Sequence, residues 1–157
     1  MTKQVQFPVS DEQLKAIGRI TVAFSFLENT IAFFVWELLG REQRVGQIVT
    51  AGLSFNQLVN LFGSLYRHRV TDAEKIAALE TLLKKIEQAQ TERNAIVHSE
   101  WAAGESGTTN RVRRTARASK GFQLQFRAMD VSDLEKIATF IAEVGAEVQV
   151  FIFSTFS

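Results

Sequence analysis

Residues 17–39 read IGRITVAFSFLENTIAFFVWELL and decide the fold. Their large apolar side chains recur at alternating spacings of three and four residues, which is the period of one face of an α-helix. Ser10 and Gln13 form a capping box before this stretch, and Gly40 provides a stop after it. The pattern therefore predicts a long core helix. Its stripe consists of Ile17, Ile20, Phe24, Leu27, Ile31, Phe34 and Leu38.

The rest of the chain repeats this combination of a cap and an apolar stripe. Ser54, Thr71 and Ser132 are each followed three residues later by glutamine or glutamate, a spacing typical of helix starts. The second members of these pairs are Gln57, Glu74 and Glu135. We therefore expect helices at about 11–39, 42–50, 55–68, 72–98 and 133–153.

Between the fourth and the last helix the pattern changes. Ser99 and Glu100 are interpreted as the end of the fourth helix, followed by a loop. Two short runs on either side of residues 119–121 predict a β-hairpin at about 111–127. The expected architecture is mainly all-α: an up-and-down bundle of four to five helices with a small β-hairpin before the last helix. No repeat or linker divides it, so we expect one domain over residues 1–157.

Composition limits the possible functions. A net charge of +1 gives the whole chain no strong attraction to nucleic acid, so any such binding must come from a local basic cluster. The absence of cysteine excludes disulfides, thiol catalysis and iron–sulfur clusters. The chain also lacks a glycine-rich phosphate loop, an H-E-x-x-H motif and a G-x-S-x-G motif. Its two histidines lie thirty residues apart, so no metal or cofactor is expected.

A cytoplasmic location without membrane association is expected. Residues 1–8 lack the apolar core of a signal peptide. The apolar stretch at 17–39 contains three charged residues, which suits a core helix better than a membrane span. The apolar run at 148–156 is too short to cross a bilayer.

The end of the fourth predicted helix is the most informative part of the chain. Its stripe is apolar for three turns and then becomes polar, and the polar part contains R-N-A-I-V-H at Arg93–His98. This segment, within Glu92–Trp101, resembles the signature of the HEPN superfamily (higher eukaryotes and prokaryotes nucleotide-binding domains). That signature is an arginine, often followed by asparagine, then a histidine after four to six residues. The stripe of the fourth predicted helix, apolar at first and then polar, consists of Ile76, Leu79, Leu83, Ile86, Gln90, Arg93 and Val97.

The resemblance covers roughly residues 10–101 and the last helix, and it leaves the arginine-rich hairpin outside the family's core. It implies a helical bundle that often dimerises, so that motif residues of two subunits face one cleft. Many members look like metal-independent ribonucleases of toxin–antitoxin, phage-defence or RNA-processing systems, and others only bind. The expected partners are a second copy of the chain, RNA, and an antitoxin or another protein.

The motif side chains suit RNA cleavage without a metal. Histidine titrates near neutrality, so His98 can take a proton from a ribose 2′-hydroxyl. Arg93 offers a planar charged fork to phosphate oxygens, and Asn94 offers one further hydrogen bond. Asn94 and His98 share a helix face, whereas Arg93 and His98 differ by roughly 140° around the axis. A dimer cleft that pairs His98 with Arg93 of the second copy would relax this constraint.

Structural roles for the same residues stay open at this point. Arg93 can pair with a buried carboxylate, and His98 can interact with the negative end of the helix dipole. Glu28 lies among apolar residues of the first helix, where an unpaired charge is costly. It either pairs with Arg93 and orients the guanidinium, or lies at the edge of the stripe in water. Trp101 is expected to pack rather than to stack on bases.

The hairpin carries the basic residues Arg111, Arg113, Arg114, Arg117 and Lys120. In a strand, Arg111, Arg113 and Arg117 project from one face. Such a face can bind RNA phosphates without reading sequence. It can equally protect the hairpin edge from aggregation, which charged side chains commonly do.

Two functions of different class follow. The first is a HEPN-like metal-independent endoribonuclease or RNA-binding protein in which Arg93, Asn94 and His98 act, supported by Glu28. The second is a non-catalytic helical dimerisation or interaction module. Its phenylalanine-rich first helix and the tail at Val150–Phe153 would bury a partner surface, and the motif would be a structural polar network.

Overall fold

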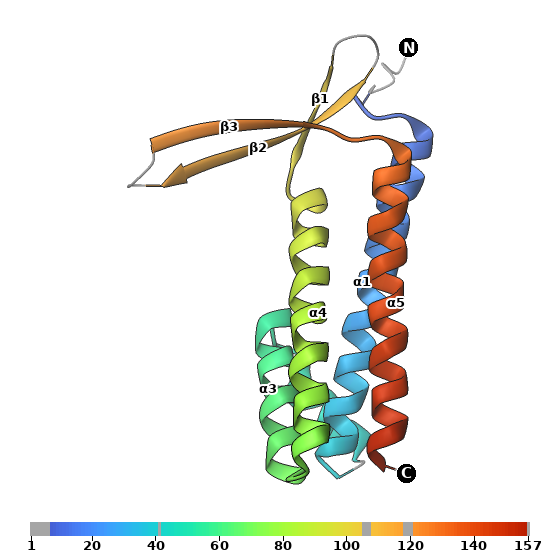
Figure 1. Cartoon of the computed structure of the whole chain (residues 1–157), viewed down its shortest axis with the longest axis vertical. Helices are drawn as coiled ribbons and strands as arrows, with labels where there is room; N and C mark the ends of the chain where they lie inside the picture. The colour runs from blue at the N-terminus through green and yellow to red at the C-terminus, as the bar shows by residue number, and fades with distance from the viewer. Residues whose placement is uncertain (1–6, 41, 105–107, 118–120, 157) are drawn as a thin grey trace.

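The computed structural model describes residues 7–40, 42–104, 108–117 and 121–156. These residues confirm the predicted helical fold with a small antiparallel sheet before the last helix. Figure 1 shows the long helices side by side, with the sheet at one end of the bundle and two of its strands extending sideways. In chain order the elements are α1 (Asp11–Leu38), α2 (Gln43–Thr50), α3 (Phe55–Arg69), α4 (Ala73–Val97), β1 (Glu100–Ala103), β2 (Thr109–Arg117), β3 (Gly121–Ala128) and α5 (Val131–Phe156).

Side-chain caps begin α1 and α3 as predicted. The N–H of Gln13 donates to the Ser10 hydroxyl (3.2 Å), and the N–H of Ser10 donates to the Gln13 side chain (2.9 Å). Ser54 and Gln57 form the same reciprocal pair. Gly40 follows the end of α1 with φ at 105°, a left-handed conformation that favours glycine and ends the helix.

Aspartates cap α4 and α5, and the two predicted caps are wrong. Asp72 accepts a hydrogen bond from the N–H of Lys75 (2.9 Å), and Asp130 accepts one from the N–H of Asp133 (2.8 Å). A carboxylate is a strong cap because its charge also interacts favourably with the positive end of the helix dipole. α5 consequently begins before residue 133. The predicted caps that are not used are Thr71 and Ser132.

α1 and α5 lie along each other and run in the same direction. Near their starts, the side chain of Gln13 donates to the carbonyl of Met129 (3.0 Å). Further along both helices, the Phe26 ring lies directly against Gly145, whose missing side chain allows the close approach. By length and composition alone, α1 and α5 could each cross a membrane, but helices of a soluble core have the same character. Here both helices contribute to one core.

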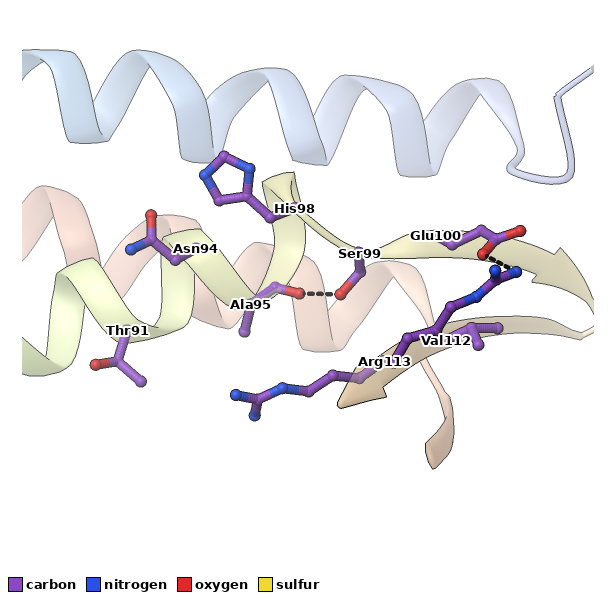
Figure 2. Close-up of a pocket in the computed structure, with 9 residues that line it drawn as sticks. Thr91, Asn94, Ala95, His98, Ser99, Glu100, Val112 and Arg113 are labelled. Atoms are coloured by element: carbon purple, nitrogen blue, oxygen red, sulfur yellow. Dashed lines mark hydrogen bonds and ion pairs between the residues drawn. The ribbon is translucent and has the colours of Figure 1, made fainter. Parts of the chain in front are cut away.

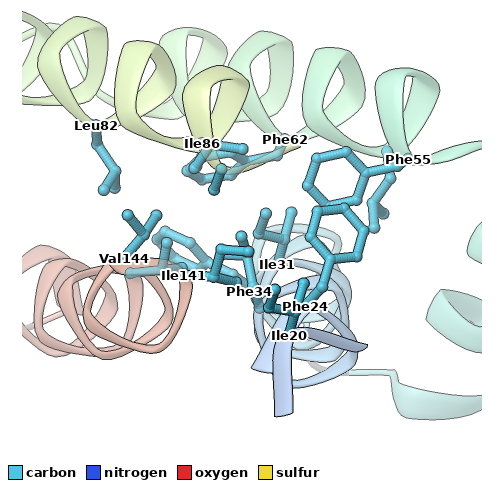
Figure 3. Close-up of a cluster of buried hydrophobic side chains, with 14 of the residues drawn as sticks. Ile20, Phe24, Ile31, Phe34, Phe55, Phe62, Leu82, Ile86, Ile141 and Val144 are labelled. Atoms are coloured by element: carbon cyan, nitrogen blue, oxygen red, sulfur yellow. The ribbon is translucent and has the colours of Figure 1, made fainter. Parts of the chain in front are cut away.

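The core lies between α1 and α5 on one side and α3 and α4 on the other (Figure 3). Phe34 of α1 joins three helices, because its ring centroid lies 5.2 Å from that of Phe62 in α3 and 6.2 Å from that of Phe151 in α5. The predicted α1 stripe is buried except for Ile17, which is half-buried. Helix periodicity therefore predicted the inner face of α1 correctly.

The inner face of α4 differs from the predicted stripe in its last turns. Ile96 is 1% exposed, whereas Val97, the predicted last member, is 39% exposed. The buried face runs through Ile86 and Ala89 to Ile96, and half-buried Arg93 falls between them at helical spacing. Packing of α4 against both α1 and α5 selects this face, and so it turns Arg93 inward.

β1 is an element that the sequence pattern did not predict. Glu100, interpreted as a helix end, begins the strand opposite Val112, and Ala103 ends it opposite Thr109. Four residues carry too little pattern to identify a strand, and β2 supplies the partner that makes them one. Trp101 is half-buried against the core, which confirms that it packs.

Candidate functional site

A cleft of about 500 Å³ lies between the last turns of α4 and the middle of β2 (Figure 2). His98 ends α4, where its backbone N–H donates to the carbonyl of Asn94 (3.2 Å), and its imidazole is exposed. The hydroxyl of Ser99 donates to the carbonyl of Ala95 (2.5 Å) and completes the last turn. The cleft is lined by Thr91, Asn94, Ala95, His98, Ser99, Glu100, Val112, Arg113 and Arg114.

The cleft forms because β1 is shorter than β2. β1 begins at Glu100, opposite Val112, so β2 has no neighbouring strand on that side from Arg113 onward. The uncovered edge of β2 is one wall of the cleft, and the end of α4 is the other. A strand that the sequence did not reveal thus sets the position of the site.

Asn94, His98 and Arg113 all line this cleft, with Asn94 and His98 on one side of α4 and Arg113 on the other (Figure 2). Figure 2 shows Arg113 extending from β2 beside the last turns of α4. Asn94 and His98 line the same cleft, which confirms the shared helix face predicted from their spacing. Arg113 is exposed and forms no hydrogen bond or ion pair with any residue that the structure describes. The cleft therefore combines an imidazole, an amide and an unneutralised cation.

Arg93 lies on the inner side of α4 and does not line this cleft. Its guanidinium carbon is 4.8 Å from the centroid of the Phe24 ring, which is a cation–π contact. One of its N–H groups donates to Oδ1 of Asn94 (2.9 Å), and its Nε is buried without a hydrogen-bond partner among the described residues. Because arginine only donates, the carbonyl end of the Asn94 amide faces Arg93, and the amide N–H groups can bind another acceptor.

Glu28 does not pair with Arg93. It is half-buried on α1, one turn after Phe24, and within the described ranges it makes neither a hydrogen bond nor an ion pair. Arg93 contacts the Phe24 ring instead. Of the two interpretations of Glu28, the position at the edge of the stripe is the one that fits.

The strand register gathers arginines on one face of the hairpin. Arg111 pairs with Arg127, and Arg113 pairs with Gln125, so all four side chains share a face. Burial lowers the pKa of Arg111, and the positive charges of Arg127 and Arg113 lower it further, against the opposing charge of Glu92. Sequence reasoning missed Arg127, although its alternation with the preceding glutamines was the available signal. We call these three arginines and Gln125 the basic face.

The remaining basic residues of the hairpin are placed differently. Arg114 pairs with Leu124 on the opposite face, and it forms an ion pair with Glu100 (2.5 Å). Its charge is therefore neutralised at the cleft. Arg117 belongs to β2, but its side chain and the whole of Lys120 lie outside the described residues.

A groove of about 810 Å³ runs between α3 and α4 and meets the cleft. Thr91 and Asn94 line both hollows, so the two are continuous along α4. Asn56 and Asn60 of α3 and Gln90 of α4 contribute amides to the groove. Sequence reasoning missed this groove, and the spacing of the two α3 asparagines, one helical turn apart, was its signal.

Within the described parts of the chain, no group of three or more histidine, aspartate and glutamate side chains is arranged to hold a metal ion. Comparison of the chain with protein-family models, curated proteins and solved structures found no match. The function is therefore inferred from the cleft, the groove and the basic face.

Proposed function

We propose that this chain is a HEPN-like RNA-binding protein that cleaves RNA without a metal at the His98 cleft and acts in the cytoplasm. The observation that carries the proposal is that His98, Asn94 and Arg113 line one open cleft. No described carboxylate neutralises this arginine. Imidazole, amide and guanidinium are the groups that proton transfer and phosphate binding require.

In the proposed reaction, the His98 imidazole takes the proton of a ribose 2′-hydroxyl. The 2′ oxygen then bonds to the adjacent phosphorus, the bond from phosphorus to the 5′ oxygen breaks, and the departing oxygen takes a proton from water. The products are a 2′,3′-cyclic phosphate and a 5′-hydroxyl. Arg113 and the amide N–H of Asn94 bind the phosphate oxygens, whose negative charge grows in the transition state.

Arg93 has a positioning role in this proposal. The HEPN resemblance implies that the motif arginine binds phosphate, but the guanidinium of Arg93 lies against Phe24. Its hydrogen bond to Asn94 turns the amide N–H groups of that residue toward an acceptor. Arg113, which comes from the hairpin, takes the phosphate-binding role in its place.

RNA on either side of the reacting phosphate would follow the surfaces that meet at the cleft. The basic face offers Arg111, Arg113 and Arg127 to phosphates on one side. The α3–α4 groove offers the amides of Asn56 and Asn60 on the other, which can bond to bases and to ribose hydroxyls. Single-stranded RNA fits this description because its bases are accessible.

Incubation of purified protein with end-labelled RNA in the presence of EDTA tests the proposal. The wild type should cleave and leave a cyclic phosphate. His98→Ala should lose about 10²-fold or more of the rate, because it removes the general base. His68→Ala is the matched control, since this second histidine is exposed at the end of α3, outside the cleft. Wild-type cleavage by folded His98→Ala would contradict the assignment.

A non-catalytic interaction module is the second candidate function. The inner position of Arg93, with its contacts to Phe24 and Asn94, is what a structural polar network would require. In that case no variant changes cleavage, because the wild type has none. Arg93→Ala would then act only on stability, with a loss of roughly 1–3 kcal/mol in the free energy of unfolding.

A further inference from the structure

β3 is the outer strand of the sheet and is exposed along its whole length. With β2 it extends away from the helices (Figure 1). Its alternate side chains include three large apolar ones, Phe122, Leu124 and Phe126, which are 65%, 46% and 64% exposed. An exposed apolar edge strand is a template for pairing with another strand.

The open edge of β3 has a defined hydrogen-bonding pattern. The N–H of Met129 donates to the carbonyl of Thr109 (3.0 Å), and the β2–β3 register continues from there without interruption to the start of β3. Backbone groups alternate along an antiparallel strand, so the odd-numbered residues of β3 bond to β2. The N–H and C=O groups of Phe122, Leu124 and Phe126 therefore point to the open edge.

The sequence of β3 is symmetric about Leu124. Residues 122–126 read FQLQF, the same in both directions. A two-fold axis between antiparallel strands reverses one copy against the other, so a symmetric sequence pairs each residue with a like residue. We propose that two copies of this chain dimerise by antiparallel pairing of their β3 strands about Leu124. Phe122 of each copy then lies opposite Phe126 of the other, and Leu124 opposite Leu124.

Every cross-strand pair in this dimer is compatible. The outward backbone groups of Phe122, Leu124 and Phe126 bond to those of the second copy, and their apolar side chains cover one another in part. The intervening glutamines also face each other. Arg127 faces Gly121 of the second copy, so no like charges oppose across the axis. The pairing removes an edge that would otherwise invite aggregation.

The dimer also has a consequence for the basic face. The two-fold axis keeps the basic faces of both copies on the same side of the joined sheet. With strands about 4.8 Å apart, the backbones of the two Arg113 residues lie roughly 16 Å from each other. One basic surface then links the two His98 clefts. The interface depends on β3 alone and is independent of the proposed ribonuclease activity.

The first test is the molar mass in solution, measured by light scattering after size exclusion at micromolar concentrations. The wild type should be a dimer. Leu124→Pro removes an outward N–H while leaving every β2–β3 hydrogen bond, so it should raise the dimer Kd about tenfold or more with unchanged helical circular dichroism. Ile48→Lys, at an exposed apolar position on α2, is the control and should stay dimeric. A monomeric wild type, or a dimer that Leu124→Pro leaves intact, would overturn the proposal.

The second test fixes the register by disulfide crosslinking. The chain has no cysteine, so a single introduced cysteine can only form a bond between copies. Opposite residues of a hydrogen-bonded pair have Cα atoms about 5.5 Å apart, which a disulfide spans. Leu124→Cys should crosslink on mild oxidation. Phe122→Cys, on the same face but four residues from its symmetry mate, should not. Equal crosslinking of both, or none at Leu124→Cys, would refute this pairing.

Discussion

At the scale of single residues, Arg93 links the core to the cleft. It lies at a half-buried position of α4, where its guanidinium contacts the face of the Phe24 ring and no carboxylate of the described residues pairs with it. Its hydrogen bond to Asn94 connects this inner position to a side chain of the cleft. A change at Arg93 can therefore reach the cleft through Asn94.

Arg93→Met separates the structural role from the positioning role. Methionine fills the space beside Phe24 but cannot donate to Asn94. We expect the free energy of unfolding in urea to change by less than about 1 kcal/mol. We expect RNA cleavage to fall as far as it does in Asn94→Ala, measured in the same assay. Full cleavage by Arg93→Met would show that Asn94 needs no positioning by Arg93.

At the scale of elements, the β2–β3 hairpin has two chemically different faces. The alternation of side chains along paired strands puts Arg111, Arg113 and Arg127 on one face and the apolar residues of β3 on the other. One face is thus suited to phosphates, and the edge with its apolar side chains is suited to a second copy. Neighbouring residues of β2 consequently have different expected roles.

Arg113→Gln and Arg114→Gln form a matched pair that tests the basic face. Arg113 has no neutralising partner among the described residues, whereas Arg114 is paired with Glu100. For single-stranded RNA, the logarithm of the association constant falls linearly with the logarithm of the salt concentration. We expect Arg113→Gln to reduce the magnitude of this slope by about 0.7, which corresponds to the loss of one phosphate contact. Arg114→Gln should leave the slope nearly unchanged. Fluorescence anisotropy at several salt concentrations measures both, and equal slopes would argue against this division of faces.

Arg111 is expected to weaken the fold while it serves binding. Its Nε is buried without a partner in the described structure, and burial with the charges of Arg127 and Arg113 lowers its pKa. Arg111→Met removes this buried, unpaired Nε and should therefore raise the free energy of unfolding by roughly 1 kcal/mol, while it weakens RNA binding. Arg44→Met, at an exposed position on α2, should change neither, as urea denaturation and anisotropy would report.

At the scale of the whole molecule, one core joins every long helix. Phe34 has ring contacts with α3 and α5, while its neighbour Phe33 is 49% exposed. The parallel arrangement of α1 and α5 places the first and last helices in direct contact. The bundle is thus closed by residues that lie far apart in the sequence.

Phe34→Ala and Phe33→Ala test this account of the core. Removal of the buried ring should lower the free energy of unfolding by about 3–5 kcal/mol, because it leaves a cavity among three helices. Phe33→Ala should cost less than about 1 kcal/mol, because about half of this residue is already exposed. Chemical denaturation followed by circular dichroism compares the two. Similar losses in both variants would mean that Phe33 is also buried, for example in an interface.

Much of the fold could be predicted because helix signals are local. The α1 stripe and the Ser10 and Ser54 capping boxes depend on residues three and four apart, and the structure confirms them. The shared face of Asn94 and His98 follows from the same spacing. Thr71 and Asp72 both fit the local rule for a cap, so the sequence pattern does not identify Asp72, the cap in the structure, in preference to Thr71. Local rules thus predicted the helices well and some of their ends less well.

The sequence by itself determined five helices, a basic hairpin and two of the residues that meet in the cleft. Only the tertiary structure decided that Arg93 faces Phe24, that Arg113 lines the same cleft as His98, and that Glu28 does not pair with Arg93 within the described residues. The physical reason is the sequence separation over which each kind of interaction acts. Periodicity and caps act within a turn or two, whereas the site depends on the pairing of β1 with β2 and on the packing of α4 against α1.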